Sequence, residues 1–121
     1  ALLAARGEAQ VRPLTGRRVL EVGCGDGAVL RELLRYGARA GDLCGLDLLP
    51  DRVERARALT PGASIEAGDA RKLPYEDGSF DLVLTSAVIL HNPPAVAERI
   101  RREVMRVAGR WAAHNEDTDV T

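Results

Sequence analysis

Apolar positions along this chain form short continuous runs that alternate with stretches of helical spacing. The short runs predict five strands, at residues 18–22, 43–47, 63–67, 80–85 and 110–114. The intervening stretches predict four helices, at residues 2–10, 27–36, 51–59 and 94–107. Strands that alternate with helices form β-α-β units with right-handed crossovers. The fold class is therefore expected to be α/β, with a doubly wound, mainly parallel sheet of about five strands flanked by helices.

Turn residues mark the ends of these elements. The run Thr60-Pro61-Gly62 stops the third helix, and Pro93-Pro94 opens the last one, since proline is well tolerated in the first turn of a helix. No repeat, low-complexity segment or convincing linker interrupts the pattern. One domain is therefore expected to cover residues 1–121, with a polar and acidic end that frays.

Charge and cysteine content exclude several classes of function. The 17 basic and 18 acidic residues give a net charge of −1, which provides no bulk attraction to nucleic acid or to an anionic membrane. No apolar run approaches the length of a membrane span. Cys24 and Cys44 lack the spacing and the neighbouring histidines of a zinc or redox centre, so no metal site is predicted. A cytoplasmic location fits these unpaired thiols.

The glycine-rich loop after the first predicted strand is the strongest functional signal. Gly23, Gly25 and Ala28 satisfy the dinucleotide pattern G-x-G-x-x-A, and Asp47 follows about 20 residues later. Glu21, however, places a carboxylate beside the expected ligand, where it would repel a pyrophosphate. It would suit a ligand that carries an amine or a sulfonium, because opposite charges attract. An NAD-dependent oxidoreductase therefore stays an alternative, and a cationic nucleoside ligand is favoured.

Four segments resemble class I S-adenosylmethionine-dependent methyltransferases of the small-molecule type. The first, Glu21-Val22-Gly23-Cys24-Gly25-Asp26-Gly27, is similar to the family's first motif. Leu46 to Pro50 resembles the end of its second strand, Gly68-Asp69-Ala70 its third motif, and Phe80 to Ser86 its fourth strand. The segments occur in the family's order at spacings of one β-α unit, and they extend from about Arg17 to Val107. The resemblance implies a Rossmann-like fold and S-adenosyl-L-methionine as cofactor.

The resemblance also implies roles for individual residues. Asp47 would bind the ribose hydroxyls, and Asp69 the exocyclic amine of adenine, with Ala70 beside the ring. The alternatives are a helix cap for Asp47 and an ordinary Asx turn for Asp69. The full predicted set of cofactor-binding residues is Glu21, Gly23, Cys24, Gly25, Gly27, Asp47, Leu48, Asp69, Ala70 and Thr85.

The segment His91-Asn92-Pro93-Pro94 is the candidate for contact with the methyl acceptor. It differs from the N-P-P-[YF] motif of amino methyltransferases, because Asn92 comes too late after the fourth strand and Ala95 replaces the aromatic residue. It more closely resembles a histidine loop of small-molecule methyltransferases. His91 is the catalytic candidate, since its reference pKa lies near neutrality. A histidine at a helix entry with no catalytic part is the alternative.

The C-terminal part departs from the family pattern. The chain is expected to lack the last two strands, so that a fifth strand around Arg110 to His114 exposes its edge. An exposed edge favours pairing with a second copy of the chain, and a homodimer through this strand is one expectation. Two further interpretations of the chain stay open: it is a fragment of a larger enzyme, or it is a noncatalytic module that binds S-adenosylmethionine. The acceptor is expected to be a small molecule of unspecified identity.

Overall fold

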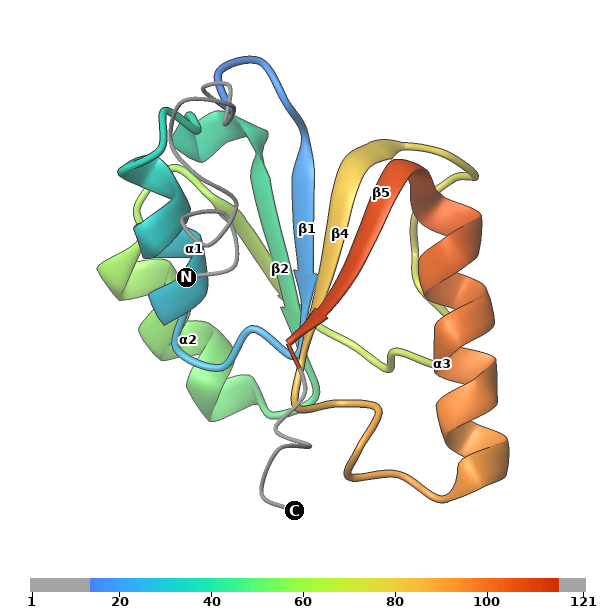
Figure 1. Cartoon of the computed structure of the whole chain (residues 1–121). Coiled ribbons are helices and arrows are strands. Elements are labelled where there is room, and N and C mark those ends of the chain that lie inside the picture. The colour runs from blue at the N-terminus through green and yellow to red at the C-terminus, as the bar shows by residue number, and fades with distance from the viewer. Residues whose placement is uncertain (1–13, 116–121) are drawn as a thin grey trace.

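The computed structural model describes residues 14–115, which form a five-stranded, fully parallel sheet in the order β3-β2-β1-β4-β5 (Figure 1). The strands are β1 (Val19–Val22), β2 (Leu43–Asp47), β3 (Ser64–Ala67), β4 (Phe80–Ser86) and β5 (Ala108–Asn115). The helices are α1 (Ala28–Leu34), α2 (Pro50–Leu59) and α3 (Pro94–Val107), with a short 3-10 turn at Ala40–Asp42. The parallel α/β fold is confirmed, and the helix predicted at residues 2–10 lies outside the described part.

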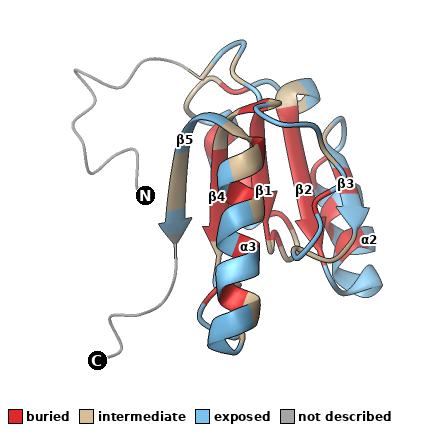
Figure 2. Ribbon diagram, turned by 90° about the vertical axis from the view of Figure 1, so that its right-hand side faces the viewer, coloured by how far each residue is buried: buried red, intermediate tan, exposed pale blue. Residues whose placement is uncertain are grey.

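The helices cover the two faces of the sheet separately. Side chains of α1 and α2, such as Leu30 and Val53, pack in one buried cluster with Leu43 and Ile65 of the sheet. On the other face, α3 packs its Ile100 and other apolar residues in a second cluster. Figure 2 shows that the three inner strands are buried, whereas β3 and β5 at the two edges are more exposed. Strands buried on both faces are typical of parallel sheets, and this explains the continuous apolar runs in the sequence.

The strand order reverses direction between β1 and β4. From β1 the chain proceeds to β2 and β3 on one side, and then crosses to β4 and β5 on the other. The loops that follow β1 and β4 therefore diverge at the carboxyl edge of the sheet. In open α/β sheets, a crevice at such a point is where ligands bind.

Two element boundaries differ from the prediction by two residues. α1 ends at Leu34 because the N–H groups of Tyr36 and Gly37 turn back to Leu33 and Leu34 in a tight turn. β5 begins at Ala108, directly after α3, rather than at Arg110. Gly109 permits this early start, because a Cβ there would lie 2.9 Å from the carbonyl oxygen of Gly78.

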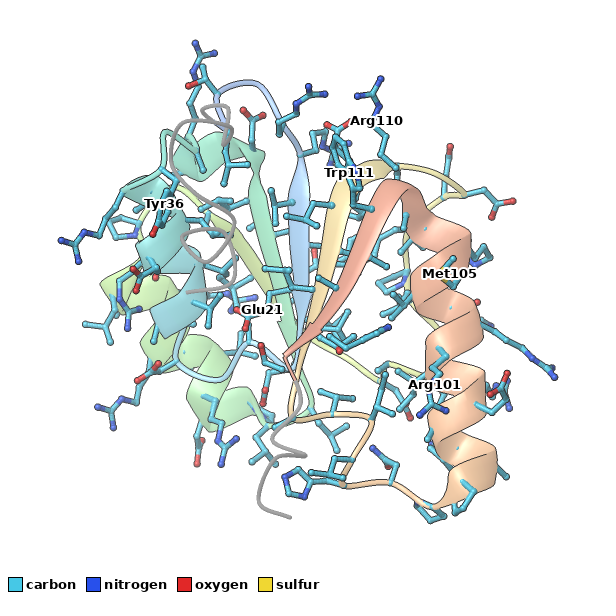
Figure 3. The ribbon with its side chains drawn as sticks, in the orientation of Figure 1. Glu21, Tyr36, Arg101, Met105, Arg110 and Trp111 are labelled. Carbon is cyan, nitrogen blue, oxygen red and sulfur yellow. The ribbon has the colours of Figure 1, made fainter. Side chains whose placement is uncertain are left out.

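The end of the sheet opposite the carboxyl edge carries an exposed aromatic residue. Trp111 of β5 is 51% exposed, and the guanidinium groups of Arg17 and Arg110 lie 5.6 and 5.4 Å from its ring (Figure 3). Within residues 14–115, no helix has the length and apolar character needed to cross a membrane. The predictions of a cytoplasmic location, of a homodimer and of a single domain over residues 1–121 stay predictions.

Candidate cofactor site

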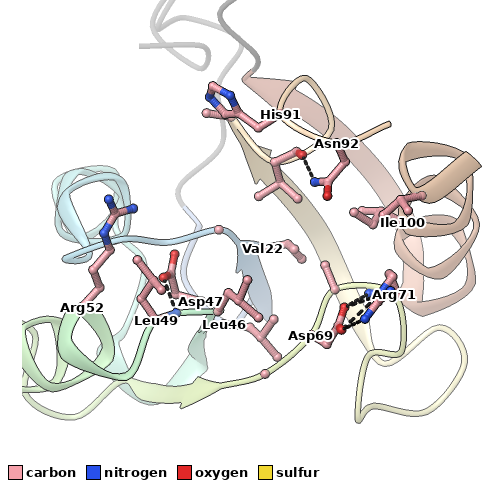
Figure 4. Close-up of a pocket in the computed structure, with 17 residues that line it drawn as sticks. Val22, Leu46, Asp47, Leu49, Arg52, Asp69, Arg71, His91, Asn92 and Ile100 are labelled. Atoms are coloured by element: carbon pink, nitrogen blue, oxygen red, sulfur yellow. Dashed lines mark hydrogen bonds and ion pairs between the residues drawn. The ribbon is translucent and has the colours of Figure 1, made fainter. Parts of the chain in front are cut away.

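A cavity of about 440 Å³ opens at the carboxyl edge of the sheet, between the ends of β1, β2 and β3 and the start of α3 (Figure 4). Its volume falls in the range of small-molecule sites. Its walls come from the ends of strands and the loops that follow them, together with one residue of α2 and two residues of α3. They are Val22, Gly23, Leu46, Asp47, Leu48, Leu49, Arg52, Gly68, Asp69, Ala70, Arg71, Ala87, Val88, His91, Asn92, Val96 and Ile100.

Each glycine of the loop after β1 has a positive φ angle. The angle is 82° at Gly23, 56° at Gly25 and 90° at Gly27, a region that residues with a Cβ rarely adopt. A Cβ at Gly23 would lie 2.1 Å from Cγ2 of Val88, so no side chain fits there. A Cβ at Gly25 would meet nothing within 4 Å. The loop therefore packs tightly at its start and leaves open space above its centre.

Asp47 connects the end of β2 to this loop. Its Oδ1 accepts a hydrogen bond from the N–H of Gly25 at 3.0 Å, and its Oδ2 accepts one from the N–H of Leu49 at 3.1 Å. The carboxylate is buried, and each oxygen keeps a further lone pair for a ligand hydroxyl. Leu49, rather than Asp47, is the N-cap residue of α2. Asp47 thus supports the loop and faces the cavity at the same time.

Glu21 is a buried carboxylate near the carboxyl end of β1 (Figure 3). Only 1% of the residue is exposed, and its Oε2 accepts a hydrogen bond from the hydroxyl of Ser86. Its Oε1 has no hydrogen-bond partner among the described residues. Burial raises the pKa of Glu21 from 4.5 to about 7; the nearby carboxylates of Asp47 and Asp26 add to the rise, and the bond from Ser86 opposes it. An unpaired buried carboxylate gains free energy from a cationic ligand group beside it.

Asp69 lies across the cavity, in the loop after β3. It forms an ion pair with Arg71, with Oδ2 and Nη2 2.6 Å apart, and both residues line the cavity (Figure 4). The hydrogen bonds from the side chain of Arg71 hold the pKa of Asp69 below its usual value. The N–H of Arg71 also donates to Oδ1 of Asp69 at 2.9 Å. The Asx turn that was the alternative for Asp69 is therefore present, and it leaves the carboxylate in the wall of the cavity.

The loop that carries Asp69 is anchored to α3 by a charged pair. Glu103 accepts a hydrogen bond from the N–H of Leu73 at 2.8 Å. Arg106 donates to the carbonyl oxygens of Leu73 and Tyr75, at 2.9 and 2.8 Å, and it also bonds to Glu103. Since α3 packs on the sheet, these bonds fix the loop relative to β1 and β2. The cavity wall thus depends on a helix that follows the loop in sequence.

A family model described as a methyltransferase domain matches residues 19–109, from β1 to the start of β5. The chain belongs to this family. The match confirms the resemblance predicted from the four segments, and it speaks against the oxidoreductase alternative.

Relatives of this methyltransferase-domain chain are longer than the chain itself. Norajmaline N-methyltransferase of Rauvolfia serpentina is 36% identical over 103 residues, which cover 79% of this chain and 34% of that enzyme. The PH0226 protein of Pyrococcus horikoshii OT3 has a similar structure, with a TM-score of 0.74 at 28% identity, covering 91% of this chain and 51% of that one. An S-adenosylmethionine dependent methyltransferase from Mesorhizobium loti gives a TM-score of 0.69 at 30% identity, covering 89% and 49%. The chain spans about a third of the curated relative and about half of the two solved structures.

The methyltransferase-domain cavity includes six of the residues singled out from the sequence: Gly23, Asp47, Leu48, Asp69, Ala70 and His91. Glu21, Gly25 and Gly27 lie in β1 or in the glycine loop, outside the cavity lining. Cys24 is 5% exposed, and burial raises the pKa of its thiol to about 12, so the thiol stays protonated at neutral pH.

Thr85 is also outside the lining. Its hydroxyl is fully buried and lies 2.7 Å from Nδ1 of His114 in β5. The neighbouring residue, Ser86, points to the opposite face of the sheet and reaches Glu21. The structure therefore brings Ser86, which the sequence did not single out, to the carboxylate of the first motif.

The loop after β4 forms the remaining wall. His91 is exposed in the cavity wall, whereas the side-chain amide of Asn92 donates to the carbonyl oxygen of Val88 at 2.6 Å and so holds the loop in place. Ala87 has a φ angle of 53°, a conformation uncommon for residues other than glycine.

Some lining residues lie outside every motif that the sequence analysis singled out. Among them are Arg52, Arg71, Val96 and Ile100. Val96 and Ile100 are four positions apart, so helical spacing puts them on one face of α3. The sequence does not say that this face borders a cavity, because that depends on how α3 packs.

Proposed function

We propose that this chain binds S-adenosyl-L-methionine and contributes to methyl transfer to a small-molecule acceptor by direct in-line displacement. The observation that carries the proposal is Glu21, a buried carboxylate with an unpaired oxygen at the glycine loop of a methyltransferase-domain chain. Such a group is costly to bury alone, and the amine and sulfonium of the cofactor would offset that cost.

The other residues fit the same ligand. The two oxygens of Asp47 have lone pairs available for the two ribose hydroxyls, and Asp69 with Ala70 would receive the adenine. The space above Gly25 is open, as a closely approaching ligand requires. When bound, the cofactor supplies a methyl group made electrophilic by the sulfonium. The contribution of the chain is then to bind and to orient, and good orientation alone lowers a barrier substantially.

On the acceptor side, we propose that His91 orients the acceptor or accepts its proton. His91 is one of the residues that line the cavity, and histidine is a common general base. Asn92 is a poorer candidate, because its amide is already bonded to Val88. The named relative that acts on norajmaline supports a small-molecule acceptor.

The alternative expected from the sequence, a noncatalytic module that binds S-adenosylmethionine, differs from this proposal only on the acceptor side. Both functions require the cofactor, so cofactor binding is the first quantity to measure.

The test is calorimetric titration with S-adenosylmethionine, S-adenosylhomocysteine and NAD, using the wild-type chain and two glycine variants. Gly25→Ala places a methyl group in the open space above the glycine loop, which the proposal assigns to the cofactor, and it should abolish binding. Gly16→Ala is the matched control, because Gly16 also has a positive φ angle, 82°, and a Cβ there also meets nothing within 4 Å. Both variants cost about 1–2 kcal/mol of backbone strain. Only the first alters the proposed site.

Micromolar binding of the two sulfur nucleosides, lost in Gly25→Ala and kept in Gly16→Ala, would support the proposal. Equal losses in both variants would indicate destabilisation of the fold rather than a blocked site. Binding of NAD alone, or of none of the three ligands by the wild-type chain, would refute the proposal. An acceptor screen with the chain that binds the cofactor would then separate catalysis from binding alone.

A further inference from the structure

Among the described residues, a single residue, Arg71, donates hydrogen bonds to the carboxylate of Asp69. The N–H of Arg71 donates to Oδ1 at 2.9 Å, and its Nε donates to Oδ1 and Oδ2 at 3.1 and 3.0 Å. Its Nη2 donates to Oδ2 at 2.6 Å. The single Nε–H is shared between the two oxygens, so three N–H groups of Arg71 make these four contacts.

A carboxylate has about four lone-pair sites for hydrogen bonds. Three N–H groups of Arg71 therefore occupy about three of these sites on Asp69, and two of the three groups belong to the guanidinium. Both side chains line the cavity, so this carboxylate faces the space where a ligand would lie (Figure 4). A ligand amine therefore competes with the guanidinium for the acceptor positions of Asp69.

We infer that Arg71 is an affinity-setting residue that competes with the amino group of an adenine ring for the carboxylate of Asp69. This inference rests on the proposed function, because it takes the ligand to be an adenine nucleoside. In the ligand-free chain the guanidinium occupies about two of the acceptor positions of Asp69, and a ligand amine gains full access to the carboxylate only when the guanidinium moves away or shares them. The free energy of cofactor binding is reduced by the free energy of that displacement.

The guanidinium can move without disturbing the loop. The bond from the N–H of Arg71 belongs to the Asx turn, and it stays in place when the side chain leaves. The side chains of Arg71 and Asp69 are 52% and 44% exposed, so water replaces the lost bonds of the guanidinium. The charge of Arg99 also acts on Asp69, and it continues to favour the ionised carboxylate after Arg71 has moved.

The size of the effect follows from the exposure of the pair. Exposed ion pairs contribute little stability, and even well-aligned ones seldom exceed a several-fold change in an equilibrium constant. Removing the guanidinium should therefore raise the affinity for S-adenosylhomocysteine roughly two- to five-fold. Since salt screens exposed pairs, the wild-type affinity should also rise with ionic strength.

The experiment is calorimetric titration of the wild-type chain, Arg71→Gln and Arg102→Gln with S-adenosylhomocysteine and with its inosine analogue, which carries a carbonyl in place of the amine. Arg102 is the matched control, because it is an exposed arginine on α3 that forms an ion pair with Glu98, outside the cavity lining. Each titration is repeated at about 0.02 M and about 0.5 M salt, where screening lengths differ several-fold.

We expect tighter binding of S-adenosylhomocysteine by Arg71→Gln, no gain for the inosine analogue, and no change in Arg102→Gln. The increase of affinity with salt should be present in the wild-type chain and absent in Arg71→Gln. Equal or weaker binding by Arg71→Gln, with normal binding by the wild-type chain, would overturn the inference and leave the proposed function intact. Absence of binding by all three proteins would overturn the proposed function, and the inference with it.

Discussion

Glu21→Gln tests whether the buried carboxylate at the glycine loop destabilises the ligand-free fold when it is ionised. Glutamine keeps the shape of the side chain and removes the titrating proton. The pKa of Glu21 is raised from 4.5 to about 7, mainly because burial disfavours the charged form. This rise corresponds to roughly 3 kcal/mol of free energy between the protonated and the ionised forms.

The sign of the pH dependence follows from the direction of the rise. Between about pH 4.5 and about pH 7, the folded chain binds this proton more tightly than the unfolded chain does. The stabilisation from the protonated carboxyl group is therefore fully present below about pH 4.5, and it is lost as the pH rises through about 7. The wild-type chain should thus lose roughly 2–3 kcal/mol relative to Glu21→Gln between about pH 5 and about pH 8.

The assay is urea unfolding of both proteins at these two pH values. The readout is the difference in the free energy of unfolding between the wild-type chain and Glu21→Gln. Other titrating groups cancel in that difference. Ser86→Ala is the second variant: it removes the hydroxyl that stabilises the ionised carboxylate, so its stability should fall more steeply with pH than that of the wild-type chain. Parallel pH profiles for the wild-type chain and Glu21→Gln would refute the reasoning, because the carboxylate would then titrate as it does in the unfolded chain.

Three other substitutions test features of the fold by chemical denaturation. Arg106→Ala removes the bonds that anchor the loop after β3 and should lower the free energy of unfolding by about 1–2 kcal/mol. Arg102→Ala, on the same helix with a carboxylate 3.7 Å away, should change it by less than about 0.5 kcal/mol, and equal effects would contradict the anchoring role. Gly109→Ala should cost about 1–3 kcal/mol through its contact with a backbone carbonyl, whereas Gly41→Ala, with open space around its Cβ, should be tolerated. Ala87→Gly should stabilise the chain by up to about 1 kcal/mol by relieving the positive φ angle, and a loss of stability would count against strain at that position.

The sequence predicted most of the fold because local patterns determine it. Each strand from β1 to β5 lies within two residues of its predicted range. For the inner strands β1, β2 and β4 this agreement follows because buried parallel strands require apolar runs of this length. Pro94 opens α3 as expected, at the first helical position where its missing N–H is not needed. The exceptions are at boundaries such as the start of β5, where a contact between Gly109 and a distant loop decides the outcome.

The candidate site was less predictable where it depends on how strands align. Glu21 and Ser86 are 65 residues apart, and they meet because β1 and β4 pair with Glu21 opposite Leu84. A shift of one residue would instead have brought Thr85 to that face of the sheet. The pair of Asp69 and Arg71 is local, but a sequence does not tell which way an exposed arginine turns. The motifs therefore singled out the carboxylates of Glu21 and Asp69, and the structure shows their hydrogen-bond partners, Ser86 and Arg71.

The tight packing at Gly23 has a consequence for how the two sides of the cavity communicate. A Cβ at this residue would overlap Val88 and lie 2.8 Å from the carbonyl oxygen of Ser86, so the glycine loop and the loop carrying His91 are in direct contact with no space between them. A shift of one loop would therefore require the other to adjust. If the proposed function holds, we expect the affinities for cofactor and acceptor to be thermodynamically linked, so that each ligand changes the binding of the other by the same factor.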